Sequence, residues 1–327
     1  MDLIQTEVER LTSDQEKAQE AVAQVCRVIL GKEKEISEVM TAILANGHIL
    51  LEDIPGVGKT TLAVAFSRVL GLEYRRIQFT PDVMPSDLTG FSVYRREEER
   101  FVYQPGCVFC NLLLADEINR TSPRTQSALL EVMEERRVTA EGVTREVPRP
   151  FLVIATENPA GSMGTQLLPE AQVDRFMITM TLGYPDWESE LALAKGVGEE
   201  ERTLLALPVL DRETLLSMQS AVHSVYISDA VYEYILKLVI STRSHPYVER
   251  GASPRATIAM VRMVKASAWL EGRDYATPAD VERQFPYVIM HRIVVNRPAM
   301  MENMKKEQII QDIMKNTDRP PMGERSR

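Results

Sequence analysis

The sequence has few features of a secreted or membrane-spanning protein. Its 327 residues include only three cysteines, an odd number that is typical of a reducing compartment. No apolar run reaches the ~18 residues that a membrane helix needs. The first twenty residues are polar and acidic, without the basic and then apolar segments of a secretory signal. We therefore expect a cytoplasmic protein.

A surplus of positive charge is also missing. The chain has 38 Lys and Arg against 47 Asp and Glu, which gives a net charge of −9. Surfaces that bind nucleic acid non-specifically need clustered basic side chains, so this balance argues against a nucleic-acid partner, although a ring can enclose a basic pore. With 44% apolar and 26% charged residues, the composition is typical of a globular protein of one large or two modest domains.

Metal-ligand patterns are scarce as well. Cys107 and Cys110 form a lone C-x-x-C pair, whereas a zinc site wants four ligands. The four histidines show no ligand spacing. We expect these cysteines to be small buried residues beside a strand and the histidines to be structural.

Short apolar runs alternate with helical patterns in the first half of the chain. Three of five predicted strands are almost continuously apolar, which indicates burial on both faces and hence a parallel sheet covered by helices. After residue 185 the patterns are helical only. We predict an αβα domain with N-terminal helices and two hairpins at 1–185, an all-helical domain at 186–300 and a tail at 301–327. The strands are expected at 48–53, 75–79, 111–116, 151–155 and 176–182, and the hairpins at 92–103 and 138–144.

A glycine-rich segment follows the first predicted strand and opens a predicted helix, as a phosphate-binding loop requires. Its glycines let backbone N–H groups converge on phosphates, and the helix N-terminus favours an anion. Lys59 supplies positive charge for the β- and γ-phosphates, and the Thr60 hydroxyl can bind Mg²⁺. The predicted nucleotide-binding residues of this loop are Pro55, Gly56, Val57, Gly58, Lys59, Thr60 and Thr61.

The loop departs from the usual motif at its first position, where Asp53 replaces glycine. Asp is among the few residues that tolerate a positive φ. Because a carboxylate facing the phosphates would repel them, we expect the Asp53 side chain to point away. The alternative is a loop that only resembles a phosphate-binding loop.

Two carboxylates end the third predicted strand and argue against that alternative. Asp116 can hold Mg²⁺ through water, and Glu117 can activate the attacking water as a general base. An ordinary strand ending in solvated acids is the competing interpretation, but its place downstream of the glycine-rich loop favours a catalytic pair.

Three further polar residues are candidates for the reaction. Asn158 follows a strand at the sheet edge where α/β folds bind ligands, and it can orient the attacking water, although an Asn-Pro turn is the simpler interpretation. Arg175 can stabilise a transferring phosphoryl group, or it can pair with Asp174 on the surface. Arg255 follows Ser253, an expected N-cap, and can complete an anion site.

These segments together resemble the MoxR family of AAA+ ATPases. The likeness is dense over about residues 31–176 and weaker to about residue 300. It is carried by HILLEDIPGVGKTTLA, IQFTPDVMPSDLTG, PGCVFCNLLLADEINRTSPRTQSALLEVMEE, ATENPAGSMGTQLLPEAQVDRFM and GASPRA.

The resemblance implies an αβα P-loop domain with a helical lid, ATP/ADP and Mg²⁺ as ligands, and a ring, usually a hexamer. It assigns Walker A to Lys59 and Thr60, and Walker B to Asp116 and Glu117. Asn158 matches sensor 1, Arg175 an arginine finger that acts on a neighbouring subunit, and Arg255 sensor 2. The family is associated with chaperone-like remodelling or metal-centre maturation of partners, which often carry a von Willebrand factor A domain.

Three functions remain open at this stage. We favour an ATP-driven protein remodeller over a nucleic-acid motor, because the chain is acidic and has no appended DNA-binding module. The charged turn of the first hairpin, residues 95–100, mixes three arginines with three glutamates and is no clean basic patch. A nucleotide-gated scaffold with negligible turnover is the third possibility, which measured phosphate release separates from the other two.

Overall fold

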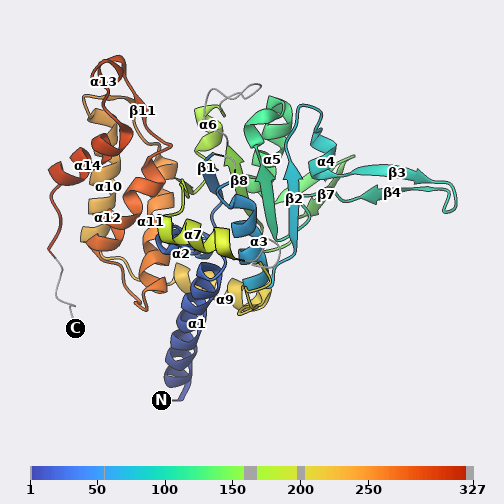
Figure 1. Cartoon of the computed structure of the whole chain (residues 1–327), viewed down its shortest axis with the longest axis horizontal. Helices are drawn as coiled ribbons and strands as arrows, with labels where there is room; N and C mark the ends of the chain where they lie inside the picture. The colour runs from blue at the N-terminus through green and yellow to red at the C-terminus, as the bar shows by residue number, and fades with distance from the viewer. Residues whose placement is uncertain (1, 55, 158–167, 197–202, 322–327) are drawn as a thin grey trace.

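The chain forms a five-stranded sheet with helices on both faces, two hairpins and a C-terminal group of helices (Figure 1). The computed structural model describes residues 2–54, 56–157, 168–196 and 203–321, with side chains from Ser13 onward. The helices of the first half are α1 (Asp2–Cys26), α2 (Glu33–Leu44), α3 (Lys59–Val69), α4 (Pro85–Thr89), the 3₁₀ helix η1 (Ile118–Arg120), α5 (Pro123–Glu135) and α6 (Glu170–Val173). Those of the second half are α7 (Trp187–Lys195), α9 (Arg212–His223), α10 (Asp229–Ser244), α11 (Pro254–Leu270), α12 (Pro278–Ile289), α13 (Arg297–Met301) and α14 (Lys306–Asn316).

The central sheet is parallel throughout, with the strand order β2-β5-β8-β1-β9. Leu112 and Leu114 of β5 join the core on one face of the sheet, whereas Leu113 and Ala115 join the core on the other face. Burial on both faces explains the nearly continuous apolar runs and confirms the predicted fold class. Its strands are β1 (Ile49–Glu52), β2 (Tyr74–Gln78), β5 (Leu112–Asp116), β8 (Leu152–Glu157) and β9 (Ile178–Met180).

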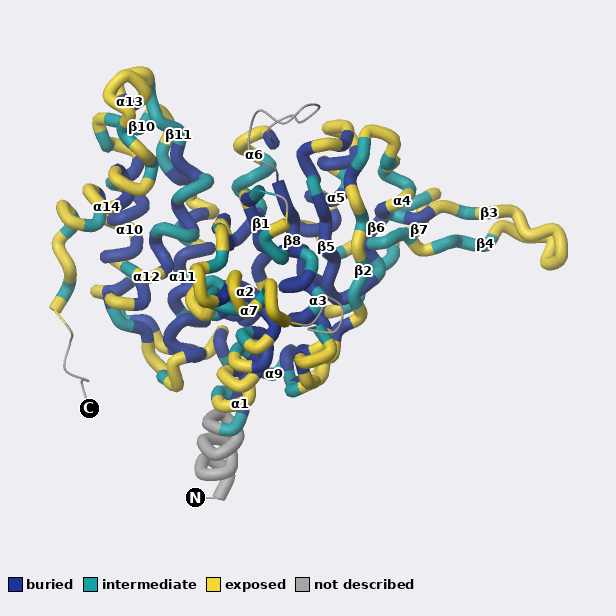
Figure 2. The backbone as a smooth tube through the Cα atoms, in the orientation of Figure 1, coloured by how far each residue is buried: buried dark blue, intermediate teal, exposed yellow. Residues whose placement is uncertain are grey.

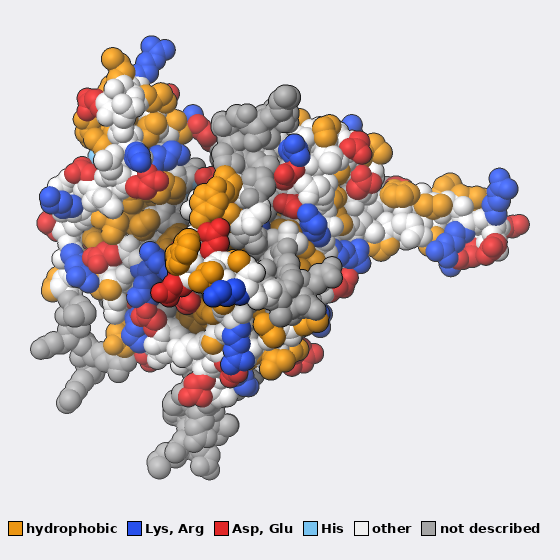
Figure 3. All heavy atoms as spheres, viewed as in Figure 1, with side chains coloured by type: hydrophobic (Ala, Val, Ile, Leu, Met, Phe, Trp, Pro, Cys, Tyr) orange, Lys and Arg blue, Asp and Glu red, His pale blue; other side chains and the backbone are white. Residues whose placement is uncertain are grey.

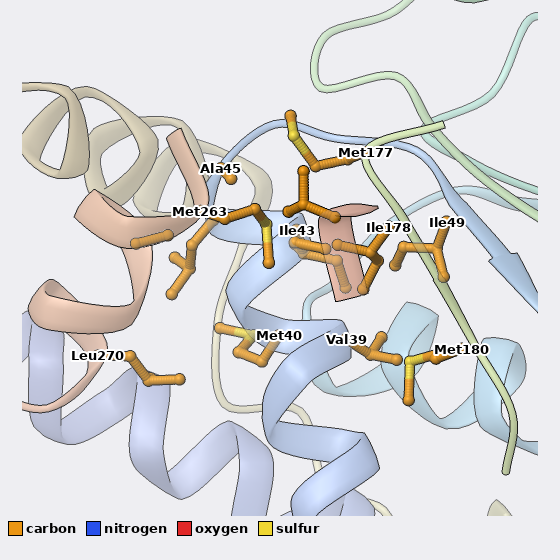
Figure 4. Close-up of a cluster of buried hydrophobic side chains, with 14 of the residues drawn as sticks. Val39, Met40, Ile43, Ala45, Ile49, Met177, Ile178, Met180, Met263 and Leu270 are labelled. Carbon is orange, nitrogen blue, oxygen red and sulfur yellow. The ribbon is translucent and has the colours of Figure 1, made fainter. Parts of the chain in front are cut away.

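One continuous apolar core joins the sheet to the helical second half. Helix α2 lies between them, and Figure 4 shows its side chains beside those of the sheet and of α11. Burying each such side chain contributes ~1.5–3 kcal/mol relative to exposure, so this packing fixes the helices against the sheet. The residues labelled there include Val39, Met40 and Ile43 of α2, Ile49 of β1, Ile178 and Met180 of β9, and Met263 and Leu270 of α11.

Two antiparallel hairpins leave the sheet domain, as the sequence predicts. The hairpin of β3 (Phe91–Arg95) and β4 (Arg100–Gln104) projects far from the body and is mostly exposed (Figures 1 and 2). The second pairs β6 (Arg137–Ala140) with β7 (Val143–Glu146). Among the described residues, no helix combines the length and the apolar character that crossing a membrane requires.

We call α10 to α14 the lid. It differs from the prediction in two places. First, it is not all-helical, because β10 (Val248–Arg250) and β11 (Val294–Val295) form a small antiparallel ribbon whose strands are too short for a periodic pattern. Second, α14 buries Ile309, Ile310 and Ile313 in the main core, so this part of the expected tail packs with the lid.

Candidate nucleotide-binding site

The glycine-rich loop connects β1 to α3 at the carboxyl edge of the sheet. Gly56 and Gly58 have φ values of 88° and 90°, which L side chains rarely adopt. Gly58 is the N-cap of α3, and a Cβ atom on Gly56 would meet nothing within 4 Å. An open loop of this shape before a helix N-terminus fits a bound phosphate chain.

Lys59 is the buried cation of this loop. Its Nζ donates to the carbonyl oxygens of Asp53 at 2.7 Å and Ile54 at 3.2 Å. Burial lowers the pKa of Lys59, while the negative charges of Asp53, Asp116 and Glu117 act in the opposite direction. The ammonium and both Walker B candidates lie at the same edge of the sheet, since β1 and β5 each run parallel to β8.

Asp53 points away from the loop, as predicted. Its carboxylate accepts hydrogen bonds from the backbone amides of Leu182 and, at 3.2 Å, Gly183, which follow β9. The residue is buried. The carboxylate therefore joins the start of the loop to the neighbouring edge strand and does not face the space over Gly56.

Asp116 and Glu117 end β5 beside this loop. Asp116 Oδ1 accepts from Thr156 Oγ1 at 2.6 Å, and its Oδ2 accepts from Arg76 at 2.7 Å. Glu117 has a left-handed backbone with φ 56°, and its amide donates to Thr156 Oγ1 at 2.8 Å. The Thr156 hydroxyl therefore orients the Asp116 carboxylate and fixes the backbone of Glu117.

The Glu117 side chain is restrained by two donors. Its Oε2 accepts from Gln78 Nε2 at 2.8 Å and from Arg120 Nη1 at 2.7 Å. Two such donors fix the direction of the carboxylate beside the loop, within reach of a water molecule bound there. Burial and then the negative charge of Glu52 raise the pKa of nearby Glu157 to about 7.

Arg175 and Arg255 lie at the opposite edge of the sheet. Arg175 precedes β9, and β9 runs parallel to β1, with Ile178 beside Ile49. Both residues line a cavity of about 450 Å³ at the amino edge, together with His48. A four-residue strand alone spans about 13 Å, so neither arginine shares a cavity with Lys59.

The two arginines bind one carboxylate. Glu134, near the end of α5, accepts from Arg175 Nη1 through Oε2 at 2.6 Å and from Arg255 Nη2 through Oε1 at 2.6 Å. Arg175 therefore pairs with Glu134 and not with Asp174. Ser253 is the N-cap residue of α11, but its side chain makes no capping bond. Its hydroxyl instead donates to Asp174 Oδ2 at 2.9 Å.

Comparisons with known proteins agree with this geometry. Residues 48–178 match the family described as "ATPase family associated with various cellular activities (AAA)", and residues 240–313 match the AAA lid domain. The chain is 37% identical over 324 residues to Chaperone MoxR1 of Mycobacterium tuberculosis, covering 96% of this chain and 85% of the relative. The chain belongs to the MoxR family of AAA+ ATPases.

Further relatives of this MoxR-family chain cover nearly its whole length. It is 44% identical over 295 residues to the uncharacterized protein YeaC of Bacillus subtilis, which is 90% of this chain and 92% of the relative. The crystal structure of a candidate ATPase from Cytophaga hutchinsonii superposes with a TM-score of 0.91 at 37% identity, covering 98% of this chain and all of that one. AAA+ ATPases in general use a nucleotide and Mg²⁺.

Sequence reasoning located the motif residues of this MoxR-family site but missed most of their partners. Arg76 and Gln78 are two residues apart on β2, so a period-2 pattern could have placed both on the same face of the sheet. Thr156, the first polar residue after the apolar run of β8, was a second available signal. The sequence contains no signal for the role of Glu134, because it is one of several acidic residues on a surface helix. Pro55 and Asn158 lie outside the described residues.

Proposed function

We propose that this MoxR-family chain binds ATP with Mg²⁺ at the β1–α3 loop and hydrolyses it, as one subunit of a ring that we take to be a hexamer. The observation that carries the proposal is the position of Lys59, Asp116 and Glu117 at one edge of the sheet, because β1 and β5 both run parallel to β8. Separate edges or cavities for these residues would have excluded it.

Different residues of the site bind the phosphates and the Mg²⁺ ion. Residues 56–61 bind the phosphates through backbone amides, with the Lys59 ammonium beside the β- and γ-phosphates. The Thr60 hydroxyl and, through water, the Asp116 carboxylate are the Mg²⁺ ligands, since both offer the oxygen donors that this ion prefers. The bound ion neutralises charge on the phosphates.

Hydrolysis then needs a base and a charge stabiliser. Glu117 accepts the proton of the attacking water, and Asn158 orients that water. Arg175 stabilises the transferring phosphoryl group of a neighbouring copy, because its position at the amino edge keeps it from the loop of its own chain. Arg255 shares the Glu134 carboxylate with Arg175, so we assign it to the same neighbouring phosphate chain.

A Glu117→Gln substitution tests the enzymatic part. We expect phosphate release to stop while ATP binding, followed with a fluorescent analogue, stays intact, because the amide cannot accept the proton but leaves the loop unchanged. Glu97→Gln in the exposed hairpin turn is the matched control and should keep parental turnover. A Glu117→Gln protein that still releases phosphate at the parental rate would contradict the assignment of the base.

We further propose a protein-remodelling role, with a von Willebrand factor A-domain or metal-centre protein as the client. The name of Chaperone MoxR1 supports it. So does the β3–β4 hairpin, where Tyr94 is 50% and Phe101 71% exposed and where Figure 3 shows apolar side chains behind a charged tip. The test compares ATPase rates with a purified von Willebrand factor A domain and with single-stranded or duplex DNA. Stimulation by DNA alone would favour a nucleic-acid motor instead.

A further inference from the structure

A buried arginine of the lid holds the segment that carries Arg175. Arg292, just after α12, donates from Nε to Oδ1 of Asp174 at 2.7 Å. Its Nη2 donates to the carbonyl oxygens of Asp174 at 3.2 Å and Phe176 at 2.6 Å. These two carbonyls flank Arg175 in the chain. One guanidinium of the lid therefore fixes the backbone on both sides of Arg175.

Arg292 is buried, so its presence needs an explanation beyond packing. The side chain is only 2% exposed, and its Nη1 also donates to the Met177 carbonyl at 3.0 Å. A buried guanidinium is costly unless its donors are satisfied, and an apolar side chain of similar volume often stabilises a core as well or better. Simple packing therefore does not explain an arginine at this position, whereas holding carbonyl groups of the sheet domain does.

Asp174 extends the connection to the second arginine of the site. Its Oδ1 binds Arg292, while its Oδ2 accepts from Ser253 Oγ at 2.9 Å. Ser253 is the N-cap residue of α11, whose first turn contains Arg255. The Asp174 carboxylate therefore links the base of Arg175 to the helix that carries Arg255, and both guanidiniums meet at Glu134.

We propose that Arg292 is a positioning residue for Arg175, and that through Asp174 it makes the reach of Arg175 depend on the position of the lid. The proposal rests on the proposed function, in which Arg175 acts on the nucleotide of a neighbouring copy. A displacement of about 1 Å at a catalytic group can cost about 100-fold in rate, so a lid that shifts Arg292 controls hydrolysis in the next subunit and not in its own.

The test uses full-length Arg292→Lys and Asp174→Asn proteins. Each should bind a fluorescent ATP analogue like the parent, because its own loop is unchanged, yet lose at least about ten-fold in kcat. Mixing either with Lys59→Ala protein should restore turnover, because the Lys59→Ala subunits supply a correctly held Arg175 to the intact loops of the variant. Asp174→Asn keeps the shape of the side chain and serves if Arg292→Lys folds poorly.

Arg273→Lys is the matched control. Arg273 donates to the buried Asp280 carboxylate at 2.6 Å, but wholly within the lid, so its loss should lower the Tm without a loss of kcat that mixing can repair. The Arg175→Ala protein mixed with Lys59→Ala is the reference. If that reference regains activity while the Arg292→Lys and Asp174→Asn mixtures do not, or if both variants keep parental kcat, the positioning role is wrong. If the reference mixture stays inactive although mixed rings form, the proposed action of Arg175 on a neighbouring copy is wrong, and the positioning role of Arg292 falls with it.

Discussion

Among single residues, Asp116 has a carboxylate that two side chains already hold. Thr156 donates to one oxygen and Arg76 to the other. If Asp116 holds Mg²⁺ as proposed, the Arg76 guanidinium competes with the ion for its negative charge. Arg76→Met should then lower the Mg²⁺ concentration that gives half-maximal ATPase activity. The change should be a few-fold, since a half-exposed ion pair contributes up to about 1 kcal/mol. A Mg²⁺ titration of the ATPase rate measures it.

Arg75→Met is the control for that titration, because Arg75 lies on the same strand but pairs with Glu73 at 3.0 Å. Its Mg²⁺ requirement should equal that of the parent. A higher Mg²⁺ requirement in Arg76→Met would show that Arg76 orients Asp116 for the ion and does not compete with it.

Asp53 leads to a prediction about stability. Asp53→Ala removes the acceptor for the amides of Leu182 and Gly183, and leaving buried donors unpaired costs about 1–3 kcal/mol. Urea unfolding should show that loss, whereas Glu52→Ala at the exposed neighbouring position should show little. If ATP affinity changes and stability does not, the carboxylate acts on the phosphates after all.

Among the helices, the contact between α2 and α12 makes the free energy of unfolding depend on pH. Glu38 of α2 accepts from Gln284 of α12 at 2.8 Å, and burial raises its pKa to about 7. In the unfolded chain the carboxyl ionises near its usual pKa of about 4.5, so the folded state binds the proton more tightly between these values. The free energy of unfolding should therefore fall as the pH rises from about 4.5 to about 7.

Glu38→Gln tests this sign directly. The variant cannot ionise, and its amide can donate to the unpaired Oε1 of Gln284. It should exceed the parent in stability by about 1–3 kcal/mol at about pH 8, with the difference vanishing near about pH 5, in urea unfolding at the two pH values. A parent whose stability rises with pH relative to the variant would contradict the raised pKa.

The elements themselves were largely predictable from the sequence, and their tertiary partners were not. Helix α11 has the predicted bounds of Pro254 and Leu270, because Pro at the first helical position and an apolar face are local signals. The β10–β11 ribbon and the packing of α14 depend on contacts between segments far apart in the chain. For the same reason Lys59, Asp116 and Glu117 were found through local motifs, whereas Arg292, which binds Asp174 118 residues away, was not.

The opposite placement of Lys59 and Arg175 makes a prediction for the whole molecule. A lone chain has its loop at one edge of the sheet and its Arg175 at the other. If Arg175 acts on the phosphoryl group as proposed, hydrolysis needs a second copy. Turnover per chain should therefore fall on dilution, in step with loss of the assembly measured by sedimentation. The Lys59→Ala protein reports the assembly without turnover. Undiminished turnover per chain in a fully monomeric sample would show that hydrolysis does not need a neighbour.

Glu134 has a consequence for the chain before it assembles. The two oxygens of one carboxylate are spaced much like two oxygens of a phosphate group, and they already hold the guanidiniums of Arg175 and Arg255. In the proposed role, Glu134 occupies in a free subunit the place that a neighbour's phosphate takes in the assembly. Free phosphate in solution would then have to displace this carboxylate, whereas the nucleotide of a docked neighbour would compete at a far higher local concentration.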